Sequence, residues 1–223
     1  LSAKNGHEGA MYSLGYFYKN GKYVVRNTEK AIEWFERSAK GRACPSIGEL
    51  LQIFLRDEVY ANSSKAEYWL RVINKEEEID GFPVFCTRVE GKKRQAAEEF
   101  TLGSMFANGV GGQINHSKAL HWYKEASNSG SQSASAELGK AYYYGRYGQQ
   151  RDLDEAERYF TKIDAQDYPN AYGMLGFIYL GKAHENRNRR SEFNRLAGIA
   201  GNFFSSYIDT NFFRNQSAPV RYE

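Results

Sequence analysis

The fold of this chain is decided by a motif that begins Ala10-Met-Tyr-Ser-Leu14-Gly15-Tyr-Phe-Tyr18 and continues as Ala31-Ile-Glu-Trp34-Phe35. The same spacing returns as Leu102-Gly103 followed by Ala119-Leu-His-Trp122-Tyr123, and again as Leu138-Gly139 followed by Ala156-Glu-Arg-Tyr159-Phe160. A further copy opens with Ala171 and Leu175-Gly176 and then degenerates. The leucine of the motif recurs after 36 residues and then after 37. A period of this length indicates a stack of repeated units.

Each copy of the motif predicts two helices. In residues 8–20, apolar side chains follow the three-and-four spacing of one helical face. Gly15 lies inside this helix, where glycine costs about 1 kcal/mol relative to alanine. We therefore expect a neighbouring helix to press against the backbone at the glycine of each copy. The second helices should begin at Thr28, at Asn115 or Ser117, and at Asp152, and Trp34 and Trp122 should be buried between helix pairs.

A degenerate unit is hidden at residues 44–74, because Leu51 and Trp69 fall one period after Leu14 and Trp34. It lacks the Leu-Gly pair, so its helices must fit together differently. The next tryptophan comes about 16 residues too late, and the excess falls in residues 75–95, which predicts a surface loop or a hinge. The expected organisation is two repeats at 5–74, this insertion at 75–95, three repeats at 96–200, and a capping helix and tail at 201–223.

The repeated pattern resembles the Sel1-like repeat family, a relative of the tetratricopeptide repeats. The resemblance implies an all-α fold, a right-handed superhelical solenoid of about five antiparallel helix pairs. Members typically act as adaptors that hold protein complexes together, and they are generally not enzymes. Many are bacterial and some are exported, so we expect the bacterial periplasm or the outside of the cell rather than the cytoplasm.

Composition excludes several classes of function. The net charge of +3 over 223 residues argues against a nucleic-acid surface, and no apolar run is long enough to span a membrane. Two separate thiols are the favoured interpretation of Cys44 and Cys86, which form neither a disulfide framework nor a metal motif. His116 and His121 are five residues apart, which does not place both on one helical face. We expect no metal, no cofactor and no catalytic residues.

The predicted function is the binding of a protein partner to the inner, concave face, which the first helices of successive units line. Tyrosine suits such a surface because it offers a large, stiff ring with a polar end. A basic cluster near the C-terminus could add contacts to an acidic partner. The candidate partner-binding residues are Tyr12, Tyr16, Lys19, Ser104, Asn108, Lys140, Tyr144, Tyr172, Phe177, Arg189 and Arg190.

Two questions stay open at the level of sequence. The protein could be an adaptor, or it could be a dedicated inhibitor such as an immunity protein for a toxin or lipase effector. The alternative from another class is a hydrolase acting on peptide or cell-wall fragments, which would need convergent titrating groups that the repeat does not supply. We expect a chain that is monomeric on its own and whose partner is a protein.

Overall fold

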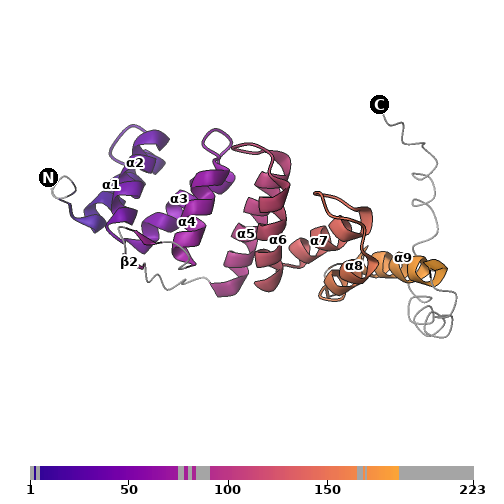
Figure 1. Ribbon diagram of the computed structural model, residues 1–223. Helices are drawn as coiled ribbons and strands as arrows, with labels where there is room; N and C mark the ends of the chain where they lie inside the picture. Colours follow the sequence, from indigo (N-terminus) through magenta and orange to yellow (C-terminus); the bar gives the residue numbers. More distant parts are fainter. Residues whose placement is uncertain are drawn as a thin grey trace, which may run out of the picture. The chain divides into compact units, whose positions relative to one another are not determined.

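The computed structural model describes residues 3, 6–74, 78–79, 82–83, 91–164, 168 and 170–185. Their regular secondary structure is helical apart from one short hairpin, which confirms the all-α repeat fold (Figure 1). The chain divides into two compact units, Leu1–Ser131 and Gln132–Glu223. The described residues contain four helix pairs and the first helix of a fifth.

Unit 1 holds three helix pairs and one short hairpin. The pairs are α1 (Glu8–Asn20) with α2 (Thr28–Lys40), α3 (Cys44–Arg56) with α4 (Ser63–Ile73), and α5 (Gly91–Asn108) with α6 (His116–Asn128). Strands β1 (Glu78–Ile79) and β2 (Phe82–Pro83) pair antiparallel between α4 and α5. The α3–α4 pair lies at the residues where the degenerate unit is expected. Residues 91–95, predicted as loop, belong to α5, where Arg94 pairs with Glu98 one turn later.

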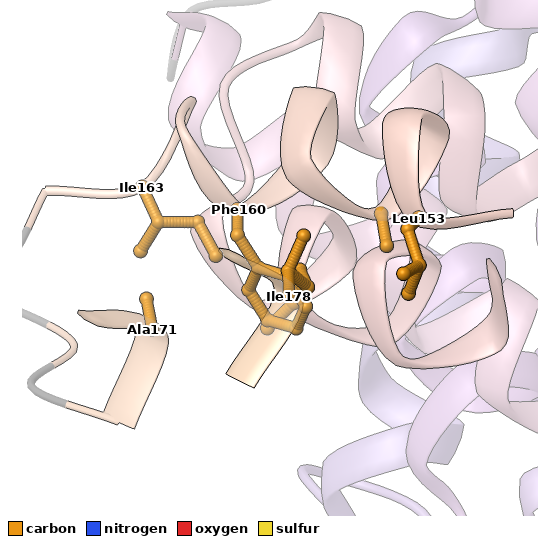
Figure 2. Packing of buried hydrophobic residues seen from close by; sticks show 7 residues of the cluster. Leu153, Phe160, Ile163, Ala171 and Ile178 are labelled. Atoms are coloured by element: carbon orange, nitrogen blue, oxygen red, sulfur yellow. The ribbon is translucent and has the colours of Figure 1, made fainter. Parts of the chain in front are cut away.

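Unit 2 holds α7 (Gln132–Tyr144), α8 (Leu153–Phe160) and α9 (Asn170–Glu185). Its core is a cluster of apolar side chains from all three helices and the segment after α8 (Figure 2), made of Ala136, Leu153, Ala156, Phe160, Ile163, Ala171 and Ile178. Burial of such side chains is the main stabilising term of a helix pair. The helix predicted to follow α9 and the tail at 201–223 lie outside the described residues.

At three of the repeat glycines, an aromatic ring of the second helix lies against the backbone of the first. A Cβ placed on Gly15 would lie 2.7 Å from the ring of Phe35, and one on Gly103 would lie 2.7 Å from the ring of Tyr123. On Gly139 it would lie 2.6 Å from Phe160. Real Cβ atoms do not approach other atoms this closely, so only glycine admits the ring. The close-approach prediction is confirmed at these three positions.

In the second pair, two other residues replace the glycine and the ring at the contact between the helices. Gln52 occupies the register of the repeat glycine, and Leu70 occupies that of the buried ring. Leu70 is fully buried while Gln52 is exposed and accepts a hydrogen bond from Lys19 of α1. The larger residue on α3 is therefore matched by a smaller one on α4, with the amide turned away from the contact.

Helix ends follow a common scheme. Gly21, Gly109 and Gly145 end the first helices in the left-handed conformation, with φ of 69°, 73° and 68°, which glycine adopts without steric cost. The α2 N-cap is Asn27, whose side chain accepts from the Lys30 N–H, so the expectation of Thr28 is wrong by one residue. Asn115 caps α6 and Asp152 caps α8, as predicted.

The two motif tryptophans differ in burial. Trp122 is fully buried, and its indole N–H donates to Glu67 of the preceding pair at 3.4 Å. Trp34 is only half-buried, with the Arg37 guanidinium 5.0 Å from its ring centre, so its predicted full burial is wrong. The reason is position: α2 belongs to the first pair, which no earlier pair covers in the described chain.

Cys44 begins α3 and is disulfide-bonded. The interpretation of two separate thiols is therefore wrong. The other cysteine of the chain, Cys86, lies outside the described residues.

Two glycine-to-alanine substitutions should change stability in opposite directions. Gly103→Ala should lower the free energy of unfolding by about 1–3 kcal/mol, because the new methyl group overpacks against Tyr123. Gly48→Ala, also inside a helix but with nothing within 4 Å of the new carbon, should raise it by up to about 1 kcal/mol. Urea unfolding followed by circular dichroism gives both values. Equal effects of the two variants would contradict the close-packing role of Gly103.

Candidate protein-binding surface

The first helices carry tyrosines that reach solvent. Tyr16 on α1 is 42% exposed, Tyr144 on α7 is 51% exposed, and Tyr172 on α9 is also exposed. In contrast, the large motif side chains of the second helices are buried, except for the half-buried Trp34 on α2. Tyr68 on α4, which precedes the motif tryptophan of that helix, is also exposed. In a helix pair, the rings of the second helix thus belong mainly to the core, and tyrosines of the first helix lie at the surface. Exposed tyrosines with restrained backbones are the side chains that often anchor protein interfaces.

Tyr12 and Lys19, two predicted contact residues on α1, serve the packing of unit 1. The Tyr12 ring lies between Phe35 at 5.9 Å and Tyr16 at 6.4 Å. Burial, followed by the nearby Glu49 carboxylate, raises the pKa of the Tyr12 hydroxyl. Lys19 forms an ion pair with Glu49 and donates to Gln52 at 3.1 Å, both on α3. These contacts join the first and second pairs, so Lys19 is engaged within the chain.

The position that Tyr16 occupies in the repeat is not exposed in every first helix of unit 1. Ile53 of α3 occupies the register of Tyr16 and is only 4% exposed. On α5 the same register holds Ser104, whose carbonyl accepts from the Asn108 amide at 2.9 Å. Asn108 is exposed at the end of the helix. Unit 1 therefore offers Tyr16 at one end of its row of first helices and a polar pair, Ser104 and Asn108, at the other.

In unit 2 the predicted residues lie on α7 and α9. Lys140 pairs with Glu137 one turn earlier at 2.7 Å. Tyr144 packs edge-on against Tyr143 at 4.8 Å, and the Arg146 guanidinium lies 4.9 Å from its ring centre. Phe177 is half-buried. Arg189 and Arg190 lie outside the described residues. That the candidate residues of both units form one partner-binding face stays a prediction.

Sequence reasoning missed a ladder of lysines on the second helices of unit 1. Lys30, Lys65 and Lys118 each stand three residues after the capping asparagine, and each ammonium lies over a ring of the first helix, at 5.5, 5.2 and 5.1 Å. Lys65 also pairs with Glu36 at 2.9 Å and Lys118 with Glu67 at 2.5 Å, both on the preceding second helix. The fixed offset of these lysines from Asn27, Asn62 and Asn115 is visible in the sequence and could have revealed the ladder.

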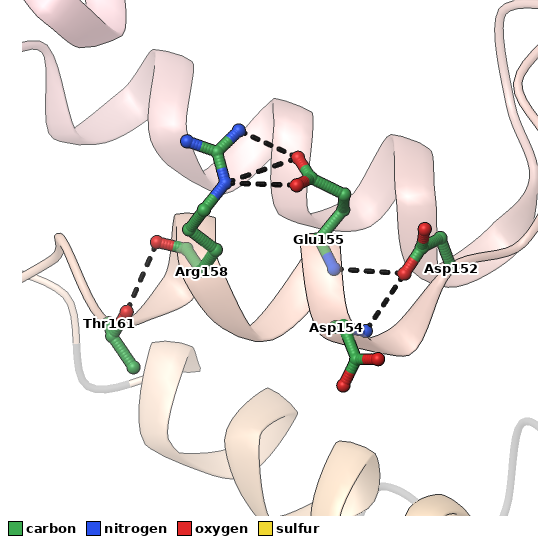
Figure 3. Close-up of polar contacts among 5 residues, drawn as sticks. All are labelled: Asp152, Asp154, Glu155, Arg158 and Thr161. Atoms are coloured by element: carbon green, nitrogen blue, oxygen red, sulfur yellow. Dashed lines mark hydrogen bonds and ion pairs between the residues drawn. The ribbon is translucent and has the colours of Figure 1, made fainter.

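The start of α8 departs from this ladder (Figure 3). Asp152 accepts from the N–H groups of Asp154 and Glu155, both at 3.0 Å. Glu155 takes the place of the ladder lysine and pairs with Arg158 on the same helix at 2.6 Å. This hydrogen-bonded pair raises the pKa of Arg158. The carboxylates of this helix start therefore have structural roles as cap and ion-pair partner.

Lys182 joins α9 to α8 through ion pairs with Asp154 and Glu157. Burial of the ammonium group lowers its pKa, but the hydrogen bonds to the two carboxylates outweigh burial and raise the pKa overall. Within the described part of the chain, no group of three or more His, Cys, Asp or Glu side chains could hold a metal ion. None of the helices described there is both long and apolar enough to cross a membrane.

The Sel1 repeat sequence profile matches residues 9–41, 100–131 and 132–163, which are the first, third and fourth helix pairs. The chain contains three Sel1 repeats. Sel1 repeat proteins generally mediate protein–protein interactions and are typically non-catalytic. The α3–α4 pair, which lacks the Leu-Gly motif, falls outside the matched residues although it forms the same helical hairpin.

Two solved structures have a similar fold. A Sel1 repeat protein from Oxalobacter formigenes is 24% identical over 78% of this chain, with a TM-score of 0.50. The c5321 protein, a protective antigen present in uropathogenic Escherichia coli strains that displays an SLR fold, is 22% identical over 90% of this chain, with a TM-score of 0.47. This chain spans 65% and 40% of the lengths of those proteins. A comparison with curated protein sequences found no match.

The Lys182 contacts predict a stability contribution that disappears at alkaline pH. Because the folded-state pKa is raised, the contribution is fully present below the unfolded lysine pKa of about 10.4 and is lost as the pH rises through the folded value. Lys182→Met should therefore lower the free energy of unfolding by about 1 kcal/mol at neutral pH. The difference from the unmodified chain should shrink above pH about 10.5. Chemical unfolding at several pH values measures it.

Lys162→Met is the matched control, since this lysine of the same unit is exposed and its ammonium lies 5.1 Å from the centre of the Tyr159 ring. A loss for Lys182→Met that stayed constant through pH 11 would show that packing of the side chain, rather than its charge, stabilises the α8–α9 contact.

Proposed function

We propose that this protein is a non-catalytic scaffold that binds one protein partner through the exposed tyrosines of its first helices. The observation that carries the proposal is a difference in exposure between the two helices of a pair. The motif rings of the second helices are buried apart from the half-buried Trp34, whereas Tyr16, Tyr144 and Tyr172 of the first helices are exposed. The Sel1 repeats support the class of function, since members generally bind proteins.

We expect this protein to bind one specific partner. The array is irregular: the second pair lacks the glycine contact, and Ile53 closes the inner register at that pair. A surface that is interrupted in this way is suited to one partner of complementary shape rather than to several equivalent ligands bound along the repeats. We therefore propose either an adaptor with a dedicated partner or an inhibitor, such as an immunity protein, of a toxin or lipase effector.

Placing a photo-crosslinking amino acid at Tyr16 or Tyr144 should identify the partner in the native organism. The same group at Lys124 is the control for non-specific capture, because Lys124 lies on α6, a second helix, whereas Tyr16 and Tyr144 lie on first helices. If the captured protein is a toxin or lipase, its activity measured with and without this chain separates an inhibitor from an adaptor. Hydrolysis of an activated ester or of cell-wall fragments by the purified chain would support the hydrolase alternative instead.

Tyr16→Ala combined with Tyr144→Ala should weaken binding of that partner at least about tenfold, because buried aromatic anchors commonly carry about 2 kcal/mol or more. The melting temperature should stay nearly unchanged, since both rings are exposed in the free chain. Calorimetric titration and circular dichroism give the two readings. Tyr68→Ala, an exposed tyrosine on a second helix, is the matched control. A greater loss from Tyr68→Ala would place the interface on the opposite face.

We also propose that the chain works in an oxidising compartment, such as the bacterial periplasm or the outside of the cell. Cys44 is disulfide-bonded, and disulfides persist in such compartments and are rare in the cytosol. The chain has one other cysteine, so an intrachain bond would join Cys44 to Cys86.

Thiol titration of the unfolded, non-reduced protein should therefore find no free thiol, and peptide mapping should recover the Cys44 and Cys86 peptides linked. The variant with both cysteines replaced by serine should lose about 2–4 kcal/mol of stability. Two free thiols in protein purified from the native organism without reductant would contradict both the bond and the proposed compartment.

A further inference from the structure

The loops that join the two helices of each pair in unit 1 carry exposed apolar side chains. In the first loop, residues 21–27, Val25 is 88% exposed and Tyr23 is 80% exposed. In the second, residues 57–62, Val59 is 80% exposed. Val110 and Ile114 are exposed in the third, residues 109–115. Apolar side chains gathered at a surface commonly mark an interaction site.

A recurring hydrogen bond explains why these side chains project. The backbone N–H of each capping asparagine donates to a carbonyl near the end of the preceding helix: Asn27 to Tyr18 at 2.9 Å, Asn62 to Phe54 at 3.0 Å, and Asn115 to Phe106 at 2.8 Å. The bond closes the base of each loop and leaves the residues between at its tip. Figure 1 shows the three loops along one edge of unit 1, which we call the loop edge.

The charges of the loop edge are arranged with opposite signs on neighbouring loops. The first loop carries Lys22 and Arg26, the second carries Asp57 and Glu58, and the third carries no charged residue. The third loop also lies against the end of the second. A Cβ placed on Gly111 would come within 2.6 Å of the Ala61 backbone, and the N–H of Ser63, the first residue of α4, donates to the Gly111 carbonyl at 3.3 Å. A basic loop beside an acidic one is complementary to a copy of itself turned through 180°.

We propose that two copies of this chain associate through the loop edge in a two-fold symmetric dimer. The first loop of each copy lies against the second loop of the other, as a two-fold axis requires. Val25 and Val59 meet across the axis, and Arg26 of one copy faces Glu58 of the other. The expectation of a chain that is monomeric on its own is replaced by this inference.

A second copy suits the loop edge better than a membrane or an acidic ligand does. The two cations and two anions of the edge cancel, so it exerts no net attraction on an anionic surface. A contact made by two loops on each side is smaller than the roughly 800 Å² per partner of a standard stable interface. The dimer should therefore be weak and depend on protein concentration.

Sedimentation velocity of the full chain over a wide concentration range tests the proposal. The unmodified chain should shift from monomer to dimer as concentration rises. Val25→Asp and Val59→Asp should each raise the dissociation constant at least about tenfold, since each appears twice in the contact. Ile114→Asp, in the third loop and outside the two-fold contact, should leave it unchanged. A monomer at every concentration, or equal effects of all three variants, would overturn the proposal.

Charge reversal gives a sharper test. Arg26→Glu and Glu58→Arg should each abolish self-association, because either change opposes like charges twice. An equal mixture of the two variants should associate again, because both contacts in the mixed dimer then join opposite charges. Asp57 is kept, since its side chain accepts from the Val59 and Tyr60 N–H groups and holds the loop. Unchanged melting temperatures confirm folding, and a mixture that stays monomeric would exclude the two-fold arrangement.

Discussion

The contact between a helix glycine and an aromatic ring is the constraint on which the rest of this structure depends. At Gly15, Gly103 and Gly139 the ring of the partner helix occupies the space where a side chain would stand. Glycine in a helix is unfavourable by about 1 kcal/mol, and the close approach offsets this because the ring is buried against the backbone. The α3–α4 pair shows that the constraint acts on both positions together, since Gln52 replaces the glycine only where Leu70 replaces the ring. The same contact places one aromatic side chain of each of these second helices in the core.

Contacts between neighbouring pairs depend on longer polar side chains. Lys65 and Lys118 each cover a ring of their own pair and reach a carboxylate of the pair before. An ammonium that serves both contacts is held by packing as well as charge. The ladder ends where α8 carries Glu155 at the lysine position and pairs within its own helix. This change in chemistry coincides with the division of the chain into two compact units after Ser131, as expected of an array in which each unit is coupled only to its neighbours.

Most of the fold could be predicted from the sequence because its determinants are local and repeated. The glycine contacts, the left-handed caps and two of the three proposed N-caps depend on residues within one period. Contacts between pairs were harder: the Lys19–Glu49 bridge joins residues 30 positions apart, and nothing in the motif specifies it. The burial of Trp34 was mispredicted because full burial needs a helix pair on both sides, and within the described residues no pair precedes the first one. Among the predicted binding residues, Tyr16, Tyr144 and Tyr172 are exposed, whereas Tyr12 and Lys19 make contacts within the protein. Their role in binding stays a prediction. The apolar loop tips were missed because they lie outside the repeated framework.

The two proposed surfaces use different parts of the repeat, and this separation has a physical basis. Tyr16, Tyr144 and Tyr172 stand on helices whose backbones the glycine contact and the core hold in place, so presenting them costs little conformational entropy on binding. The loop tips are held only at their bases, by the bond from the capping asparagine to the preceding helix. Charge reversal at Arg26 or Glu58 leaves that bond and the helix packing intact. Pairing of two chains through the loops would leave the tyrosines of both copies exposed, so that a dimer would present two copies of the partner site. A partner that itself carries two binding sites would then bind the dimer with an avidity above the affinity of one site.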